Sequence, residues 1–177
     1  MSGAIGPVQP GTGAGERFLQ MQDEEVFAAR GSNIWHTLGW RRTGWAPGSA
    51  TVEWDATADY CFPTAGGPVL QGGLVTALLD AAMGGATWTV LDRDQAFLTA
   101  DLRVEFLRST HPGTISATGT VVRRTRKVVF AAAELVDADG RHLASSRCTQ
   151  VVLPAEGPGG RYDAPPGDGS PPQDGRG

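Results

Sequence analysis

QGGLVTALLDAAMGGA, residues 71–86, is the stretch that decides the fold of this chain. It is apolar on nearly every side and, continued to Leu91, is far longer than a strand, so it predicts a helix that is buried nearly all round. Asp80 stands in its middle, between Leu79 and Ala81. A carboxylate in such surroundings is costly unless it is paired, hydrated or used in chemistry. The residues alone leave both a structural and a catalytic role open for Asp80.

A narrow polar stripe runs along the predicted helix 72–91. At about 100° per residue, Thr76, Asp80 and Thr87 fall on one side of it. Gly84 and Gly85 leave room for a sheet to approach the helix closely. We therefore expect a sheet against the apolar faces and polar groups along the stripe.

Gln71, Gly72 and Gly73 mark the start of the helix. The first backbone N–H groups of a helix lack intrahelical partners and carry the positive end of its dipole, so a carbonyl oxygen bound there would be polarised as in an oxyanion hole. Asp80 lies about 12 Å along the helix from Gly72, too far to act on that carbonyl. We therefore predict a site shared by two subunits, in which an antiparallel partner helix brings its own Asp80 to the first Gly72.

Strand signals surround the helix on both sides. Alternating patterns and turn residues predict strands at 39–42, 49–56, 96–107, 114–125, 128–137 and 142–153. The Pro- and Gly-rich residues 59–70 predict a loop, and residues 16–30 predict a further helix. This order is typical of an α+β fold with a mostly antiparallel sheet around one buried helix.

Length and composition favour one globular domain. The chain has 177 residues, of which 40% are hydrophobic, enough for a single core. Residues 1–15 and 154–177 are rich in Gly and Pro and have little to bury, so both predict disordered tails. We place the folded domain at residues 16–153.

Several classes of protein are disfavoured by the same data. A net charge of -4 argues against nucleic-acid binding. No apolar run is long enough for a membrane span, and no signal peptide is recognised, so we expect a cytoplasmic protein. Cys61 and Cys148 have no further ligands at metal-site spacing, and we expect neither a metal nor a resident cofactor.

The central stretch resembles the HGG-x(6)-D/E signature of hotdog-fold thioesterases. The resemblance is strongest to the phenylacetic-acid-degradation and 4-hydroxybenzoyl-CoA thioesterase group. It extends to TADLRVEFLRSTHPG, residues 99–113, and to DADGRHLASSRCTQVVL, residues 137–153, and covers about residues 35–153. It implies a hotdog fold, in which a curved, mostly antiparallel sheet wraps a long central helix, and homodimers that often pair into homotetramers.

The resemblance also implies hydrolysis of an acyl-CoA thioester to a free acid and coenzyme A, which is part of the substrate. The acyl carbonyl would bind the backbone N–H of Gly72, with Gly73 beside it. Asp80 of the partner subunit would act as general base on water or as nucleophile. Thr99 matches a Ser or Thr position that helps to hold the water in some members.

Two departures from the family pattern bear on the activity. Gln71 replaces the signature histidine, and keeps hydrogen-bonding capacity without the ability to carry a proton. The family's loop asparagine corresponds to Ala65. The departures keep a non-catalytic module that binds CoA or acyl-carrier protein open as an alternative. A hotdog hydratase is disfavoured because no histidine pairs with the acid, and a structural domain with Asp80 as a buried cap is a third alternative.

Binding of coenzyme A requires positive charge for its phosphates. The candidate cations lie in the turn RRTRK and in the block after the helix: Arg123, Arg124, Arg126, Lys127 and Arg108. An ordinary solvated hairpin is the alternative for the turn. Phe62 is a candidate wall of the acyl pocket, beside a group of tryptophans that core packing explains equally well: Trp35, Trp40, Trp45 and Trp54.

Overall fold

The computed structural model describes residue 11, residues 34–92 and residues 94–155. The helix predicted at 16–30 and nearly all of both predicted tails lie outside the described residues. The elements, in chain order, are α3 (Ile34–Leu38), β1 (Arg41–Ala46), β2 (Ser49–Ala56), the 3₁₀ turn η1 (Ala58–Tyr60), β3 (Cys61–Thr64), β4 (Gly67–Leu70), α4 (Gly72–Trp88), β5 (Gln95–Phe106), β6 (Gly113–Arg124), β7 (Val128–Asp137) and β8 (His142–Pro154).

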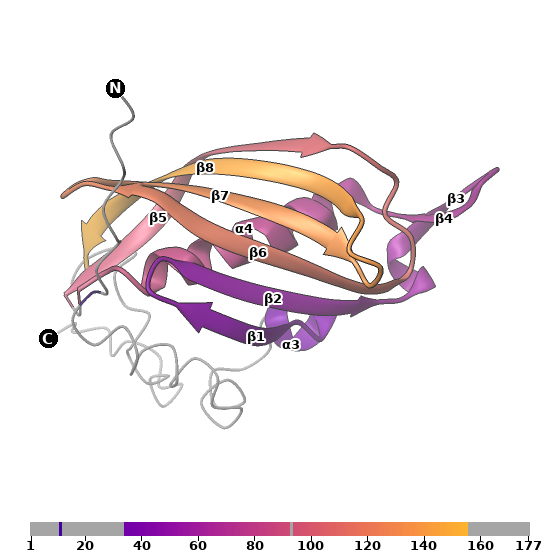
Figure 1. Ribbon diagram of the computed structural model, residues 1–177, viewed down its shortest axis with the longest axis horizontal. Helices are drawn as coiled ribbons and strands as arrows, with labels where there is room; N and C mark the ends of the chain where they lie inside the picture. The colour runs from indigo at the N-terminus through magenta and orange to yellow at the C-terminus, as the bar shows by residue number, and fades with distance from the viewer. Residues whose placement is uncertain (1–10, 12–33, 93, 156–177) are drawn as a thin grey trace, which may run out of the picture.

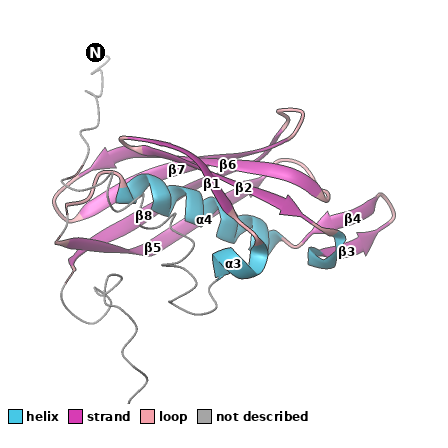
Figure 2. Ribbon diagram, turned by 90° about the horizontal axis from the view of Figure 1, so that it is seen from below, coloured by secondary structure: helices cyan, strands magenta, loops and turns pink. Residues whose placement is uncertain are grey.

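Six strands form one antiparallel sheet in the order β1-β2-β6-β7-β8-β5. The sheet curves along α4, which lies against its inner face (Figure 1), and Figure 2 shows the same two layers from below. This arrangement is the hotdog fold that the sequence predicted. Among the described residues, no helix is long and apolar enough to cross a membrane.

The helix packs closely against the sheet because small residues line the contact. A Cβ atom added to Gly119 of β6 would lie 2.2 Å from the carbonyl oxygen of Ala82, and one added to Gly85 would lie 3.0 Å from Ala50 Cβ. Large apolar side chains of the helix then fill the core, where Leu78, Leu79 and Met83 are fully buried. The predicted burial of this helix is thus confirmed, although it ends at Trp88 instead of Leu91.

Two sequence predictions were wrong in detail. Residues 59–70 are not a loop: β3 and β4 pair as a two-stranded hairpin, which projects from the body (Figure 1). Its turn is made by Ala65 and Gly66, and Gly67, the first residue of β4, lies in the left-handed region (φ 104°). Proline and glycine occupy pairing positions, with Pro63 opposite Pro68 and Thr64 opposite Gly67, which hides the strand pattern. The first strand starts two residues later than predicted and runs to Ala46, because the turn is made by Pro47 and Gly48 (φ 79°).

The strand β5 forms one edge of the sheet and pairs only with β8. Its outer edge has no partner strand among the described residues. Leu98 and Phe106 on this strand are 52% and 56% exposed. A long free edge that carries exposed apolar side chains is a surface for pairing with another chain.

Candidate active site

Asp80 is partly buried halfway along α4, and the hydroxyl of Thr99 on β5 donates a 3.0 Å hydrogen bond to its Oδ1. Burial raises the pKa of the Asp80 carboxyl, and the bond from Thr99 lowers it by a smaller amount. The net pKa lies above the ordinary value of 3.8. A carboxylate with this balance is more basic than a solvated aspartate and suits proton abstraction.

Local packing explains why Thr99 meets Asp80. The ring of Phe97 lies where a side chain on Gly84 would be, 3.2 Å from the position of its missing Cβ atom. The glycine therefore lets β5 lie close to the helix. Two residues after Phe97, Thr99 points to the same face of the sheet as Phe97. It therefore meets Asp80, which lies one helical turn before Gly84 on α4. A bulge between Thr99 and Asp101 then changes the register of the strand.

Gln71 organises the start of α4. Its side-chain Oε1 accepts a 3.1 Å hydrogen bond from the backbone N–H of Leu74, and its own backbone N–H donates to the carbonyl of Tyr60 at 3.0 Å. In the part of the chain that the structure describes, the N–H groups of Gly72 and Gly73 donate no hydrogen bond. They are the free first donors of the helix, as the sequence predicted, and Gln71 is the cap that holds them in place.

A cavity of about 400 Å³ opens beside these donors. Its lining joins three predicted site residues, Phe62, Gly72 and Arg108, with the exposed ring of Phe106. The walls are mostly apolar, and Arg108 is the one cation among the lining residues. The structure therefore brings the predicted carbonyl site and the predicted acyl wall together.

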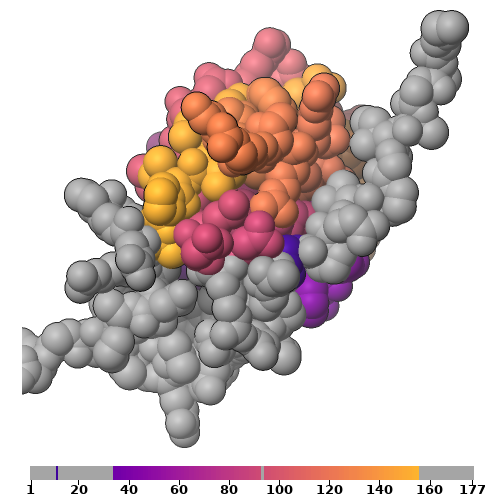
Figure 3. Space-filling model, turned by 90° about the vertical axis from the view of Figure 1, so that its left-hand side faces the viewer, coloured from indigo at the N-terminus to yellow at the C-terminus, as the bar shows by residue number. Residues whose placement is uncertain are grey.

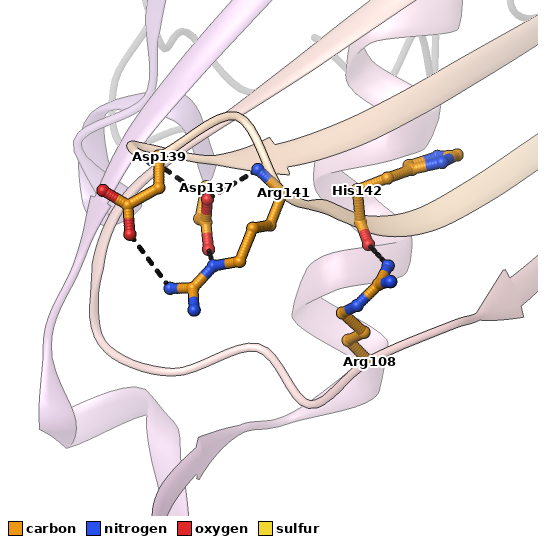
Figure 4. A network of polar contacts seen from close by, with 5 residues as sticks. All are labelled: Arg108, Asp137, Asp139, Arg141 and His142. Atoms are coloured by element: carbon orange, nitrogen blue, oxygen red, sulfur yellow. Dashed lines mark hydrogen bonds and ion pairs between the residues drawn. The ribbon is translucent and has the colours of Figure 1, made fainter.

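Arg108 also borders a second cavity, of about 410 Å³, at the β7–β8 turn. Its guanidinium donates to the backbone carbonyl of His142, and Figure 4 shows the side chain reaching toward the start of β8. In the same view Arg141 is held by Asp137 at 2.7 Å and Asp139 at 3.1 Å. Arg141 lines the second cavity only and is paired there, whereas Arg108 lines both cavities.

The cationic turn between β6 and β7 lies at the end of the molecule opposite the β3–β4 hairpin (Figure 1), on the side that faces the viewer in Figure 3. Arg124 donates to the carbonyl of Val90, to Asp92 at 2.9 Å and to Gln95 at 2.8 Å, so it ties the turn to the segment after α4. Arg123, Arg126 and Lys127 are exposed. Because α4 separates the turn from Gly72 by about 24 Å, the structure does not bring these cations to the carbonyl site within one chain.

Sequence reasoning missed Gln150 altogether. This residue of β8 is fully buried, accepts a hydrogen bond from the Thr87 hydroxyl at Oε1 and donates from Nε2 to Thr99 Oγ1 at 3.4 Å. The available signal was the alternation of β8, which turns Cys148 and Gln150 inward together. A polar residue at an inward position of a strand is costly without partners, and its partner here is the predicted polar stripe.

Three of the four tryptophans named above pack in or against the core, and Trp45 is 39% exposed. Trp35, Trp40 and Trp54 meet in edge-on contacts at 5.5 and 6.3 Å between ring centroids, and Trp40 and Trp54 are buried. They do not line the cavity beside Gly72. Among the described residues, no three His, Cys, Asp or Glu side chains gather as metal ligands.

Comparison with known proteins places this geometry in a family. Residues 67–144 match the model of the thioesterase superfamily. A predicted esterase of Saccharolobus solfataricus is 31% identical over 119 residues, which is 67% of this chain and 81% of that protein. The medium/long-chain acyl-CoA thioesterase YigI of Salmonella typhimurium is 32% identical over 97 residues, which is 48% of this chain and 63% of that protein.

Solved structures share the fold. A thioesterase family protein from Silicibacter pomeroyi superposes with a TM-score of 0.66 at 24% identity, over 77% of this chain and 98% of that protein. At this identity the likeness supports the fold. The family assignment rests on the sequence matches, namely the family model and the two relatives described above.

Proposed function

The chain belongs to the thioesterase superfamily and is a thioester hydrolase, and from this premise we propose that it hydrolyses acyl-CoA thioesters with Asp80 as the catalytic carboxylate. One observation carries the proposal: a partly buried carboxylate, raised in pKa and held by Thr99, lies on the same helix whose first N–H groups are free. A base and an oxyanion site are the two groups that hydrolysis of a thioester needs.

The active unit in this proposal is a dimer. Gly72 and Asp80 are about 12 Å apart along α4, so one subunit cannot apply both to one carbonyl. Pairing of two β5 edges would continue the sheet across the two subunits and place the two α4 helices antiparallel. The free edge of β5 and its exposed Leu98 and Phe106 support this pairing. The homotetramer and the subgroup of the family stay predictions.

The reaction follows from these positions. The thioester carbonyl oxygen accepts hydrogen bonds from the N–H groups of Gly72 and Gly73, which stabilise the negative charge that forms on it. Asp80 of the partner subunit removes a proton from water as the water attacks the carbonyl carbon, and Thr99 orients the carboxylate. The carbon–sulfur bond then breaks, and coenzyme A leaves as its thiol after taking up the proton. Direct attack by the carboxylate, followed by hydrolysis of the resulting anhydride, uses the same groups.

The antiparallel arrangement also assigns a role to the distant cations. If Asp80 of the partner subunit faces Gly72, the partner's helix continues for about 12 Å beyond that point, toward its own β6–β7 turn. Arg123, Arg126 and Lys127 of one subunit would therefore stand near the active site that begins at Gly72 of the other. Arg108, at the edge of the cavity beside Gly72, is the remaining candidate for a phosphate.

The cavity favours an apolar acyl group. Phe62 and Phe106 form its walls, and its lining carries no carboxylate. A hydrocarbon or aromatic acyl chain therefore matches these walls, and a cationic acyl group, which would face Arg108 without a carboxylate partner, does not. The Salmonella relative is named for medium and long acyl chains, which we propose as the first class to assay.

The test is hydrolysis of an acyl-CoA panel by wild type and Asp80→Asn, with release of free thiol as the signal. The panel contains acetyl, hexanoyl, palmitoyl, benzoyl, 4-hydroxybenzoyl and phenylacetyl thioesters. We expect turnover of the apolar acyl groups, and a loss of about 1,000-fold or more in the variant. Wild-type rates in the Asp80→Asn protein would refute the role of Asp80. Turnover of acyl-carrier-protein thioesters alone would replace acyl-CoA as the substrate class.

A further inference from the structure

A chain of hydrogen bonds leads from the buried end of α4 to the Asp80 carboxylate. The Thr87 hydroxyl donates to Gln150 Oε1, Gln150 Nε2 donates to Thr99 Oγ1 at 3.4 Å, and the Thr99 hydroxyl donates to Asp80 Oδ1 at 3.0 Å. Thr87 and Gln150 are both fully buried. Three elements, α4, β8 and β5, thus contribute to one polar chain inside an apolar core.

The direction of these bonds matters because each hydroxyl has a single proton. An amide side chain donates from its nitrogen and accepts at its oxygen. With Thr87 bound to the amide oxygen, the amide nitrogen of Gln150 faces Thr99, and the Thr99 proton is left for Asp80. In the reversed orientation the amide oxygen would face Thr99 and compete with Asp80 for that proton.

We infer that Gln150 is a positioning residue of the thioesterase reaction: it keeps the Thr99 proton on Asp80, while Thr87 keeps the amide of Gln150 in the required orientation. The inference rests on the proposed function, in which Asp80 is the catalytic base. Gln150 acts through Thr99, because it is fully buried and hydrogen-bonds Thr99 instead of Asp80. A buried polar chain is stabilising only when every member is satisfied, and here each of the three bonds leads toward the carboxylate.

The ionisable groups around Asp80 are limited in number. On α4 it is the only ionisable side chain between Gly72 and Trp88. On β8, burial first and the Asp80 charge second raise the pKa of the Cys148 thiol to about 12, so this thiol stays neutral at ordinary pH. On β5, Asp101 is exposed and follows the bulge after Thr99. Changes in the titration of Asp80 in the uncharged variants Gln150→Met and Thr87→Val therefore report on the hydrogen-bond chain.

The experiment uses the full-length chain and four variants: Gln150→Glu, Gln150→Met, Thr87→Val and Thr87→Ser. Thr89→Val is the matched control, since Thr89 is equally buried but its hydroxyl joins the Ala86 carbonyl and the Gly48 N–H. Two quantities are measured as functions of pH. One is kcat and KM for acyl-CoA hydrolysis, and the other is the pKa of the Asp80 carboxyl by carbon-13 NMR, which does not require activity.

The variants are expected to differ in the pKa of Asp80 and in kcat. Gln150→Glu takes the Thr99 proton and adds a like charge, so the pKa of Asp80 and the acid limb of kcat should both rise by about one unit. Gln150→Met and Thr87→Val should lower kcat about tenfold and leave KM within about twofold. Thr87→Ser, which keeps the hydroxyl, should retain most of the kcat that Thr87→Val loses. Thr89→Val should change stability without moving the pKa or the acid limb.

Two outcomes distinguish this inference from the proposed function. The same Asp80 pKa in wild type, Gln150→Met and Thr87→Val overturns the inference, whatever the activity of the protein, since a shift in Gln150→Glu alone can come from the added charge. A shifted pKa in folded variants, together with no thioester turnover by wild type, overturns the proposed function and leaves the positioning of the carboxylate supported. If Gln150→Glu does not fold, Thr87→Val and Thr87→Ser decide the question, because valine keeps the shape of threonine without the donor and serine keeps the donor without the methyl group.

Discussion

The Thr99 hydroxyl on the edge strand β5 donates a 3.0 Å hydrogen bond to Asp80 Oδ1 on α4. Burial and this bond act on the carboxyl in opposite directions: burial, the larger effect, raises its pKa, and the bond lowers it. Asp80 therefore keeps its proton to a higher pH than a solvated aspartate. An ionised, partly buried Asp80 therefore lowers the free energy of unfolding at neutral pH.

Asp80→Asn should make the fold more stable at neutral pH. Because the folded-state pKa of Asp80 is raised, the stability linked to its proton is present below the ordinary value of 3.8 and is lost as the pH rises through the folded-state pKa. The asparagine variant does not suffer this loss. Urea unfolding across that window should show a stability difference between variant and wild type that grows with pH. A difference independent of pH would contradict the raised pKa.

Gly72→Pro should remove one oxyanion donor and leave the helix intact. Proline is favoured at the first position of a helix, and the extended conformation of Gln71 (φ −64°, ψ 124°) is compatible with a proline after it. We expect kcat to fall about 100-fold. Gly72→Ala is the matched control, because its Cβ makes the same contact, 3.3 Å from the Phe106 ring, but it keeps the N–H. Equal rates for the two variants would remove Gly72 from the mechanism.

Gln71→Ala should weaken the start of α4. The side-chain oxygen of Gln71 accepts from the Leu74 N–H, and the loss of an N-cap acceptor costs about 1 kcal/mol. Gln71→Asn, a favourable N-cap residue, should restore most of the free energy of unfolding. Thermal and urea unfolding measure both values. Identical stabilities for the alanine and asparagine variants would show that the cap contributes nothing.

Gly119→Ala should be strongly destabilising. The added Cβ would lie 2.2 Å from the Ala82 carbonyl oxygen, and the obstacle is helix backbone that cannot rotate away. Overpacking of this kind costs about 1–3 kcal/mol or more. Gly66→Ala is the control, because its Cβ would meet only Thr64 Oγ1 at 3.8 Å, and its stability should stay within about 0.5 kcal/mol of wild type. A mild effect at Gly119 would mean that the helix can retreat from the sheet.

The parts of the fold with long, regular patterns were predictable. The central helix and the last four strands agree with the structure within a few residues, because each pattern extends over ten residues or more. The β3–β4 hairpin was not predictable by the same means. Its strands have four residues each, and Pro63 and Pro68 face each other in the pairing. Short strands that contain proline lack the alternation that identifies a strand.

Some residues of the candidate site could be predicted from the sequence and others could not. Asp80 stood out because a charge interrupts an apolar helix, and Gly72 stood out as the first position of that helix. Gln150 could not be recognised from the sequence, because a single glutamine in a strand does not indicate a site by itself. Only the folded structure places it beside Thr87 and Thr99. The meeting of Arg108 with Phe62 around one cavity likewise depends on how β5 returns along the helix.

The separation of Gly72 and Asp80 on one rigid helix has a genetic consequence under the proposed pairing. Neither subunit contains a complete active site, so two defective variants can complement each other in a mixed dimer. A mixed dimer of Gly72→Pro and Asp80→Asn subunits contains one site with both defects and one site with none. Co-expression of the two impaired variants should therefore give activity well above that of either variant alone, and dilution below the dimer dissociation constant should abolish this gain.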